Sequence, residues 1–140
     1  MAGTVVADTL QAASTSTLVL KNGVANTPPT VQDSAGTQIG TFCRAWVNFN
    51  GTGVVAIRAA FNVSSITDNG TGDYTVNFTT AMPDANYSVS TAVGLNVVAS
   101  IAYVVAVGQS FSTTTATRVT TWNGSPAVTD CPYVNVSIFR

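Results

Sequence analysis

Apolar and polar residues alternate along much of this chain. In the run YTVNF, the apolar residues Tyr74, Val76 and Phe78 occupy every second position, and Thr75 and Asn77 lie between them. An alternation with a period of two places successive side chains on opposite faces of a β-strand. The pattern therefore predicts strands with one face in a core and the other in solvent.

Seven segments rich in β-branched and aromatic residues are predicted to be strands. They are RAWVNFN, VVAIRAAFNVSSI, DYTVNFTT, NYSVSTAVG, VVASIAYVVAVG, SFSTTTATRVTTW and YVNVSIFR. Turn-forming sequences lie between several of them: NGTG from Asn50, DNGTGD from Asp68, MPDAN from Met82 and NGSP from Asn123. Short strands at this spacing predict an all-β fold, an antiparallel β-sandwich or jelly-roll-like head domain over residues 41–140.

Residues 1–40 have a different character. Their short alternating runs are interrupted by Pro28 and Pro29 and by Gly and Asp residues, which break a continuous sheet. We expect an extended amino-terminal arm or stem. Because such a segment buries little surface by itself, it is predicted to wrap a neighbouring subunit or to mount the head domain on a larger body.

The composition narrows the range of partners. Only 8% of the 140 residues are charged, the formal net charge is −1, and histidine is absent. Affinity for nucleic acid depends largely on a cluster of basic residues, so nucleic acid is not expected as a partner. The longest apolar run, Ile101 to Val107, is too short to cross a bilayer, and no membrane insertion is expected. With 46% hydrophobic residues and so few charges, the chain is predicted to bury apolar surface in a homo-oligomer.

The sequence carries no recognisable catalytic motif, and we expect a protein that is not an enzyme. A catalytic triad needs a base such as histidine, and phosphoryl transfer needs a phosphate-binding loop or metal-binding carboxylates. The start of the chain also lacks the charged and apolar segments of a signal peptide, so export by the Sec pathway is not expected.

The DNGTGD loop is the best candidate for a metal site. Asp68, Asn69 and Asp73 could supply oxygen ligands for a hard cation such as calcium. The loop lacks the full ligand pattern of an EF-hand, and a hairpin corner explains the same residues. The hairpin is the favoured interpretation, and no cofactor is expected.

The two cysteines, Cys43 and Cys131, are far apart in the sequence and have no histidine to complete a zinc site. A disulfide requires that the first and last core strands be neighbours. Two small buried thiols are the favoured alternative, because no export signal is present.

Exposed aromatic rings beside Asn and Asp side chains are typical of surfaces that bind sugars. Trp122 is predicted to stand at the end of a strand and to be exposed, with Asn123 and Asp130 on the loop beside it. Trp122, Asn123 and Asp130 are therefore the predicted receptor-binding residues.

Three phrases resemble a known family. They are CRAWVNFNGTG, IRAAFNVSSITDNGTGDYTVNFTTAMPDANYSV and the terminal VNVSIFR. They resemble the carboxy-terminal domain of tail fibre and related virion proteins of bacteriophages and prophages. The resemblance is strong over Phe42–Val89 and over the last eight residues, and weak between them, where receptor-facing loops would vary.

The resemblance implies a virion structural protein on the tail or capsid surface, assembled in the bacterial host cytoplasm. It implies a homotrimer that meets other phage structural proteins through its amino-terminal arm. The expected role is that of a short tail fibre or tip-like adhesin, which binds a host surface glycan.

Only about forty residues precede the domain, whereas fibres with this ending usually carry a long shaft. The alternative is a capsid head fibre or a decoration (cement) protein with no receptor role. A free bacterial carbohydrate-binding module is a third hypothesis, which the absence of a secretion signal disfavours.

Overall fold

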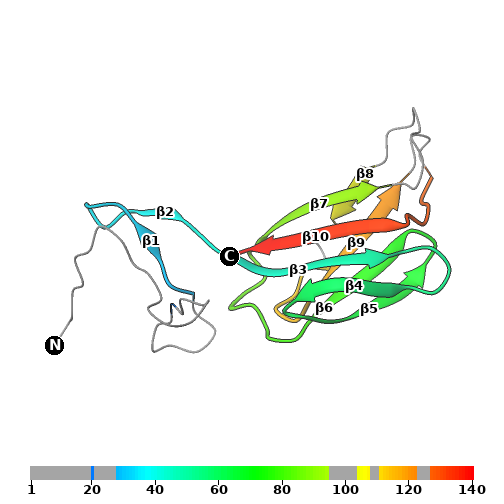
Figure 1. Ribbon diagram of the computed structural model, residues 1–140, viewed down its shortest axis with the longest axis horizontal. Coiled ribbons are helices and arrows are strands. Elements are labelled where there is room, and N and C mark those ends of the chain that lie inside the picture. The colour runs from blue at the N-terminus through cyan, green and yellow to red at the C-terminus, as the bar shows by residue number, and fades with distance from the viewer. Residues whose placement is uncertain (1–19, 21–27, 95–103, 108–110, 123–126) are drawn as a thin grey trace, which may run out of the picture.

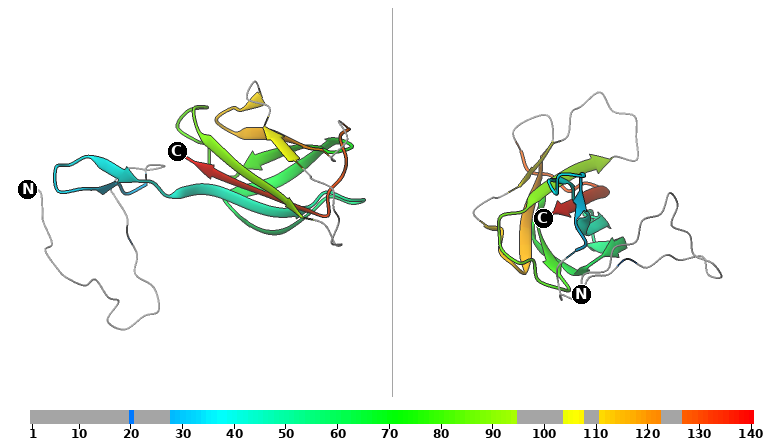
Figure 2. Two further views of the ribbon diagram at one scale, coloured as in Figure 1. Left: turned by 90° about the horizontal axis from the view of Figure 1, so that it is seen from above. Right: turned by 90° about the vertical axis from the view of Figure 1, so that its left-hand side faces the viewer.

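The computed structural model describes Leu20 and residues 28–94, 104–107, 111–122 and 127–140. The described residues form β-strands and no α-helix, and so no helix among them is long and apolar enough to cross a membrane. Two four-stranded antiparallel sheets pack face to face (Figure 1), and Figure 2 shows the two layers from other directions. The predicted antiparallel β-sandwich is confirmed.

The first sheet has the strand order β4-β3-β10-β7, and the second has the order β5-β6-β9-β8. The strands of the first sheet are β3 (Cys43–Asn50), β4 (Ala56–Phe61), β7 (Ser88–Gly94) and β10 (Tyr133–Phe139). Those of the second are β5 (Val63–Gly70), β6 (Asp73–Phe78), β8 (Val104–Val107) and β9 (Ala116–Trp122). Much of the predicted strand over residues 97–108 lies outside the described residues.

The core lies between the central strands of the two sheets and follows the predicted alternation. Each central strand turns every second side chain inward: Ala45, Val47 and Phe49 on β3, Val134, Val136 and Ile138 on β10, Tyr74, Val76 and Phe78 on β6, and Thr117, Val119 and Thr121 on β9. The rings of Phe49 and Tyr74 meet edge to face at 5.1 Å across the two layers. Such ring pairs add stability beyond the apolar area that they bury.

The chain passes from one sheet to the other at Asn62. The sequence over residues 54–66 predicts one strand, and this prediction is wrong, because β4 ends at Phe61 and β5 begins at Val63 in the opposite sheet. Asn62 has a φ of 55°, a left-handed conformation that Asn adopts more readily than most residues. A single residue thus makes the corner, with no Gly or Pro to mark it in the sequence.

The opposite end of the sandwich depends on two close contacts of glycine. Gly51 lies so close to Tyr74 that an added Cβ would come within 2.6 Å of the phenol oxygen. Gly72, with a φ of +64°, would place a Cβ 2.7 Å from the Thr121 carbonyl oxygen and 2.7 Å from the Thr129 nitrogen. The β5–β6 turn can therefore pack against the segment before β10 only because position 72 has no side chain.

A two-stranded hairpin precedes the sandwich. It consists of β1 (Val31–Gln32) and β2 (Gln38–Gly40), and its turn is held by Asp33, whose Oδ1 accepts the backbone N–H groups of Ala35 and Thr37 at 2.9 Å each. Figure 1 shows this hairpin beside the sandwich rather than within it. The attachment role of the arm over residues 1–40 stays a prediction, and most of its residues lie outside the described part.

The contacts at Gly72 predict a difference between two glycines with nearly the same φ. Gly72→Ala should lower the free energy of unfolding by about 3 kcal/mol, because the new methyl group meets backbone atoms that cannot move aside. Gly53→Ala is the matched control, since Gly53 has a φ of +63° and open space around it, and should cost about 1 kcal/mol. Urea unfolding measures both, and equal costs would contradict the packing argument.

Candidate functional site

The predicted receptor rim is only partly described. Trp122 is the last residue of β9 and is half-buried, and its indole nitrogen donates to Thr120 Oγ1 at 3.0 Å. Asn123 lies outside the described residues. The structure therefore leaves the predicted pairing of Trp122 with Asn123 a prediction.

Asp130, the third rim residue, helps to close one end of the sandwich. Its Oδ1 accepts the backbone N–H of Gly72 at 2.7 Å, and lies 2.8 Å from the hydroxyl of Tyr74. Burial, and then the neighbouring carboxylate, raise the pKa of Tyr74 well above its ordinary value, so the phenol keeps its proton. One carboxylate oxygen of Asp130 is thus engaged in the fold, which disfavours Asp130 as a receptor ligand.

The DNGTGD segment forms the β5–β6 hairpin corner that the turn residues predict. Asp68 Oδ1 accepts the N–H of Gly70 at 2.9 Å, which is an Asx turn. Asn69 turns its amide N–H₂ toward Asp73 Oδ1 at 3.3 Å and toward Thr75 Oγ1 at 2.9 Å. A donor in this position is unsuited to a cation, which needs oxygen ligands.

Asp73 also forms a bidentate ion pair with Arg118 across the β6–β9 strand pair. Nε of Arg118 donates to Asp73 Oδ1 at 2.7 Å, and the second contact joins Arg118 Nη2 to Asp73 Oδ2. The guanidinium hydrogen bond holds the pKa of Asp73 below its usual value. Within the described ranges, no group of three or more acidic, Cys or His residues could hold a metal ion. The calcium hypothesis for Asp68, Asn69 and Asp73 gains no support from this arrangement.

The two cysteines are free thiols, and they lie at opposite ends of one strand pair. Cys43 is opposite Phe139 in the β3–β10 register, whereas the carbonyl of Cys131 accepts the N–H of Gly51, beyond the far end of β3. The condition for a disulfide, neighbouring first and last core strands, is met. Because these strands are antiparallel, the two cysteines are separated by about 25 Å along the strand, so no bond can join them within one chain.

Three exposed aromatic residues lie on the outer side of the first sheet. We call this surface the aromatic face and define it by Trp46, Phe61 and Tyr133, whose exposed fractions are 39%, 55% and 38%. Trp46 and Phe61 are directly opposite on β3 and β4, and such pairs share one side of a sheet. Tyr133 alternates with the buried Val134 and so points outward as well.

Polar groups between these rings are fixed by contacts within the sheet. Asn48 Nδ2 donates to Asn135 Oδ1 at 2.6 Å across β3 and β10, and the Arg58 guanidinium lies 4.2 Å from the centre of the Tyr133 ring. A cation over an aromatic ring is attracted by its electron-rich face. The aromatic face therefore carries aromatic rings with amide groups between them, and the guanidinium of Arg58 gives it positive charge.

The prediction from the sequence placed the exposed ring at a strand end, on Trp122, and did not include the aromatic face. A signal was nevertheless present, because Trp46 shares its side of β3 with Arg44, Asn48 and Asn50. Polar residues at every second position mark the solvent side of a strand. Trp46 therefore belongs to the polar side of its own strand.

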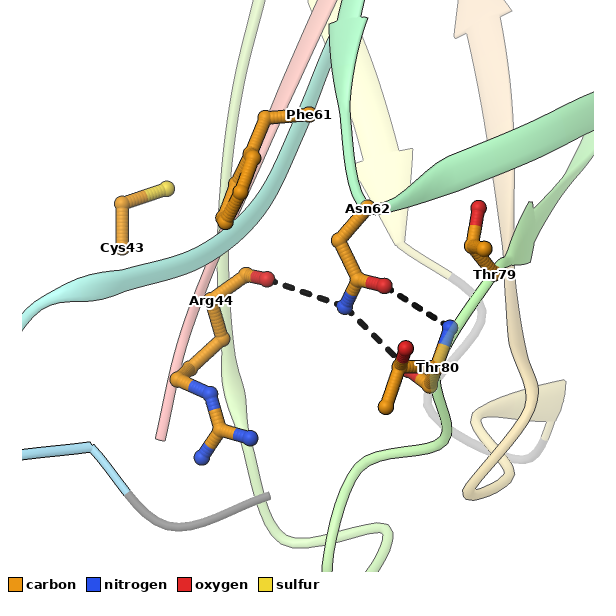
Figure 3. Close-up of a pocket in the computed structure, with 6 residues that line it drawn as sticks. All are labelled: Cys43, Arg44, Phe61, Asn62, Thr79 and Thr80. Carbon is orange, nitrogen blue, oxygen red and sulfur yellow. Dashed lines mark hydrogen bonds between the residues drawn. The ribbon is translucent and has the colours of Figure 1, made fainter. Parts of the chain in front are cut away.

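A pocket of about 350 Å³ opens beside Phe61 (Figure 3). It lies where the chain crosses between the sheets, at the end of the sandwich nearer β2. Its walls come from the start of β3, the β4–β5 corner and the segment after β6, and its lining residues are Cys43, Arg44, Phe61, Asn62, Thr79 and Thr80.

The aromatic face and the pocket beside Phe61 are suited to binding by ring contact and hydrogen bonding. Asp73 and Asp84 are each engaged by an arginine, and no pocket-lining residue is a carboxylate or an imidazole. Proton transfer needs such a group close to the reacting atom.

No protein-family model, curated protein or solved structure matches this chain. The resemblance to phage tail fibre domains therefore stays a prediction from the sequence, and the surface chemistry carries the functional argument that follows.

The Asp73–Arg118 pair predicts a specific acid sensitivity. Because the pKa of Asp73 is lower in the folded chain than in the unfolded one, the pair stabilises the fold above about pH 5, and this stabilisation is lost as the pH falls through the lowered pKa. Arg118→Gln should therefore reduce the free energy of unfolding at pH 7 and flatten its decline in acid. Urea unfolding at pH 7, 4 and 3 measures this.

Arg58→Gln is the matched control, because the described contact of Arg58 is with a ring and not with a carboxylate. Its effect should be the same at each pH. An unchanged acid slope in the Arg118 variant would show that the pair contributes nothing to acid stability.

Proposed function

We propose that this chain is a bacteriophage virion surface protein that binds a glycan on the host cell through its aromatic face. The observation that carries the proposal is the grouping of Trp46, Phe61 and Tyr133 on one outer sheet surface, each more than a third exposed. The resemblance of the sequence to tail fibre domains supports the placement on a virion. The proposal includes no enzymatic activity.

The chemistry of the aromatic face suits sugars. A sugar ring presents C–H groups on its flat sides, which an electron-rich aromatic face attracts, and hydroxyl groups at its edge, which amides such as Asn48 and Asn135 can bind. Because the rings stand on paired strands, little conformational entropy is lost when a ligand binds. The aromatic face is thus organised before the ligand arrives.

The proposal includes a homotrimer, attached by its arm to other phage structural proteins and assembled in the bacterial host cytoplasm. A single sugar site of this kind is weak. Identical sites on three subunits, and many trimers on a particle, raise the overall affinity without new contacts. The low charge of the chain and the exposed apolar side chains outside the aromatic face, such as Val54 and Val128, are consistent with contacts between subunits.

A capsid head fibre or decoration protein is the second candidate, and the arm favours it. Val31 and Ile39 on the arm expose 40% and 65% of their surface. Apolar side chains left open on an arm are suited to packing against a larger body. The arm could therefore hold the chain on a capsid whether or not the aromatic face meets a receptor.

Two tryptophan variants distinguish the aromatic face from the rim predicted by the sequence. We expect Trp46→Ala to lower adsorption of the protein to host cells by about tenfold or more, as for an aromatic residue central to an interface. Trp122→Ala should have little effect, and both variants should keep the wild-type oligomer by light scattering. Flow cytometry of cells with labelled protein measures adsorption. Loss of adsorption with the Trp122→Ala variant alone would show that the receptor binds at the rim beside Trp122 and not at the aromatic face.

The position on the virion separates the two candidates. For an adhesin, cryo-electron microscopy of intact virions with this protein labelled should show density in threes at the tail or baseplate. A regular array over the capsid lattice would instead identify a decoration protein, and would make the receptor role of the aromatic face untenable if adsorption is also unchanged in Trp46→Ala virions.

A further inference from the structure

The pocket beside Phe61 adjoins the aromatic face but has a different shape and chemistry. Phe61 belongs to both, because its ring lies on the outer side of β4 and also forms one wall of the pocket (Figure 3). A volume of about 350 Å³ is near the lower end of the range for small-molecule sites. A ligand lying over Trp46 could therefore place one of its groups in the pocket.

The pocket is built around a strained and heavily bonded residue. The side chain of Asn62 donates to the carbonyl oxygens of Arg44 at 3.0 Å and Thr80 at 3.1 Å, and accepts the Thr80 N–H at 2.7 Å. The Asn62 carbonyl also accepts the N–H of Thr79 at 3.2 Å. These bonds offset the cost of a left-handed φ, and unusual backbone conformations of this kind gather at functional sites. The walls are therefore fixed in the free protein.

Three of the other lining residues suit an amphipathic ligand. Phe61 exposes 55% of its surface, and its ring offers an apolar surface. Thr79 and Thr80 are exposed, their backbones are held by Asn62, and no hydrogen bond of the described residues involves either hydroxyl. One side of the pocket thus offers an aromatic face and another offers two hydroxyls that can each donate and accept.

We propose that this pocket binds one pyranose ring of the host glycan. The flat C–H side of the ring lies against Phe61, and its hydroxyls bond to the side chains of Thr79 and Thr80. This assignment rests on the proposed function and identifies the part of the site that recognises a single sugar residue. The neighbouring sugar of the chain lies over Trp46, opposite Phe61 in the strand register.

Nuclear magnetic resonance tests the pocket directly on the full chain. ¹⁵N-labelled protein is titrated with methyl glycosides of glucose, galactose, mannose, rhamnose and N-acetylglucosamine, each up to about 10 mM, tenfold above a millimolar Kd. At least one glycoside should shift the amide signals of Phe61, Thr79 and Thr80 in a saturable manner. The absence of such shifts with every glycoside would overturn the assignment.

Variants test which atoms make the contact. Phe61→Ala, and Thr79→Val with Thr80→Val, should each weaken binding of the shifted glycoside by about tenfold. Phe111→Ala and Thr71→Val are the matched controls, since Phe111 is also 55% exposed and Thr71 is an exposed hairpin residue. Both controls should bind as the wild type does, and near-equal binding by all the variants would contradict the proposal.

Three further outcomes separate this inference from the proposed function. Shifts confined to the region of Trp122, with normal adsorption to cells, would overturn the pocket and leave the adhesin standing. Loss of the oligomer in the Phe61 or threonine variants, with no sugar binding in the wild type, would assign the pocket to subunit packing instead. Sugar binding at the pocket without adsorption to cells would support the pocket and contradict the adhesin.

Discussion

The hydrogen bonds of Asn62 are the constraint on which both layers of the sandwich depend. They join the β4–β5 corner to the carbonyl of Arg44 in one sheet and to the backbone of Thr80, which follows β6 in the other. Because the corner is a single residue, the registers of β4 against β3 and of β5 against β6 are set together. A slip of one residue in either strand would move its apolar side chains to the wrong face. One side chain therefore aligns the two sheets and shapes the pocket between them.

Much of the fold was predictable because its signal is local. The alternation of Tyr74, Val76 and Phe78 determines which side of β6 is buried, and neighbouring residues are enough to reveal it. The corner at Asn62 was not predictable in this way. Asn is common in strands and turns of this chain, and its left-handed φ depends on partners 18 residues away in both directions. The chain supplies no local signal for a conformation stabilised by distant carbonyl groups.

The candidate site also combines features that the local sequence predicts with features that depend on distant residues. The polar side of β3 could be read from Arg44, Trp46 and Asn48, so the exposure of Trp46 was available from the sequence. The position of Phe61 opposite Trp46 could not be predicted from the sequence, because it depends on the β3–β4 register and on the bulge between Asn48 and Phe49. Asp130 was predicted to be a rim residue because it lies on the loop after Trp122. Its partners are instead a glycine N–H and a phenol that only the tertiary fold brings near.

The two thiols differ in their reactivity and in their position relative to the pocket. Cys131 is fully buried, and its pKa is raised by burial, so its sulfur is poorly reactive. Cys43 is half-buried and lines the pocket. A ligand in the pocket would lie against Cys43, the less buried of the two cysteines. The rate at which the Cys43 sulfur is alkylated is therefore expected to depend on whether the pocket is empty or filled.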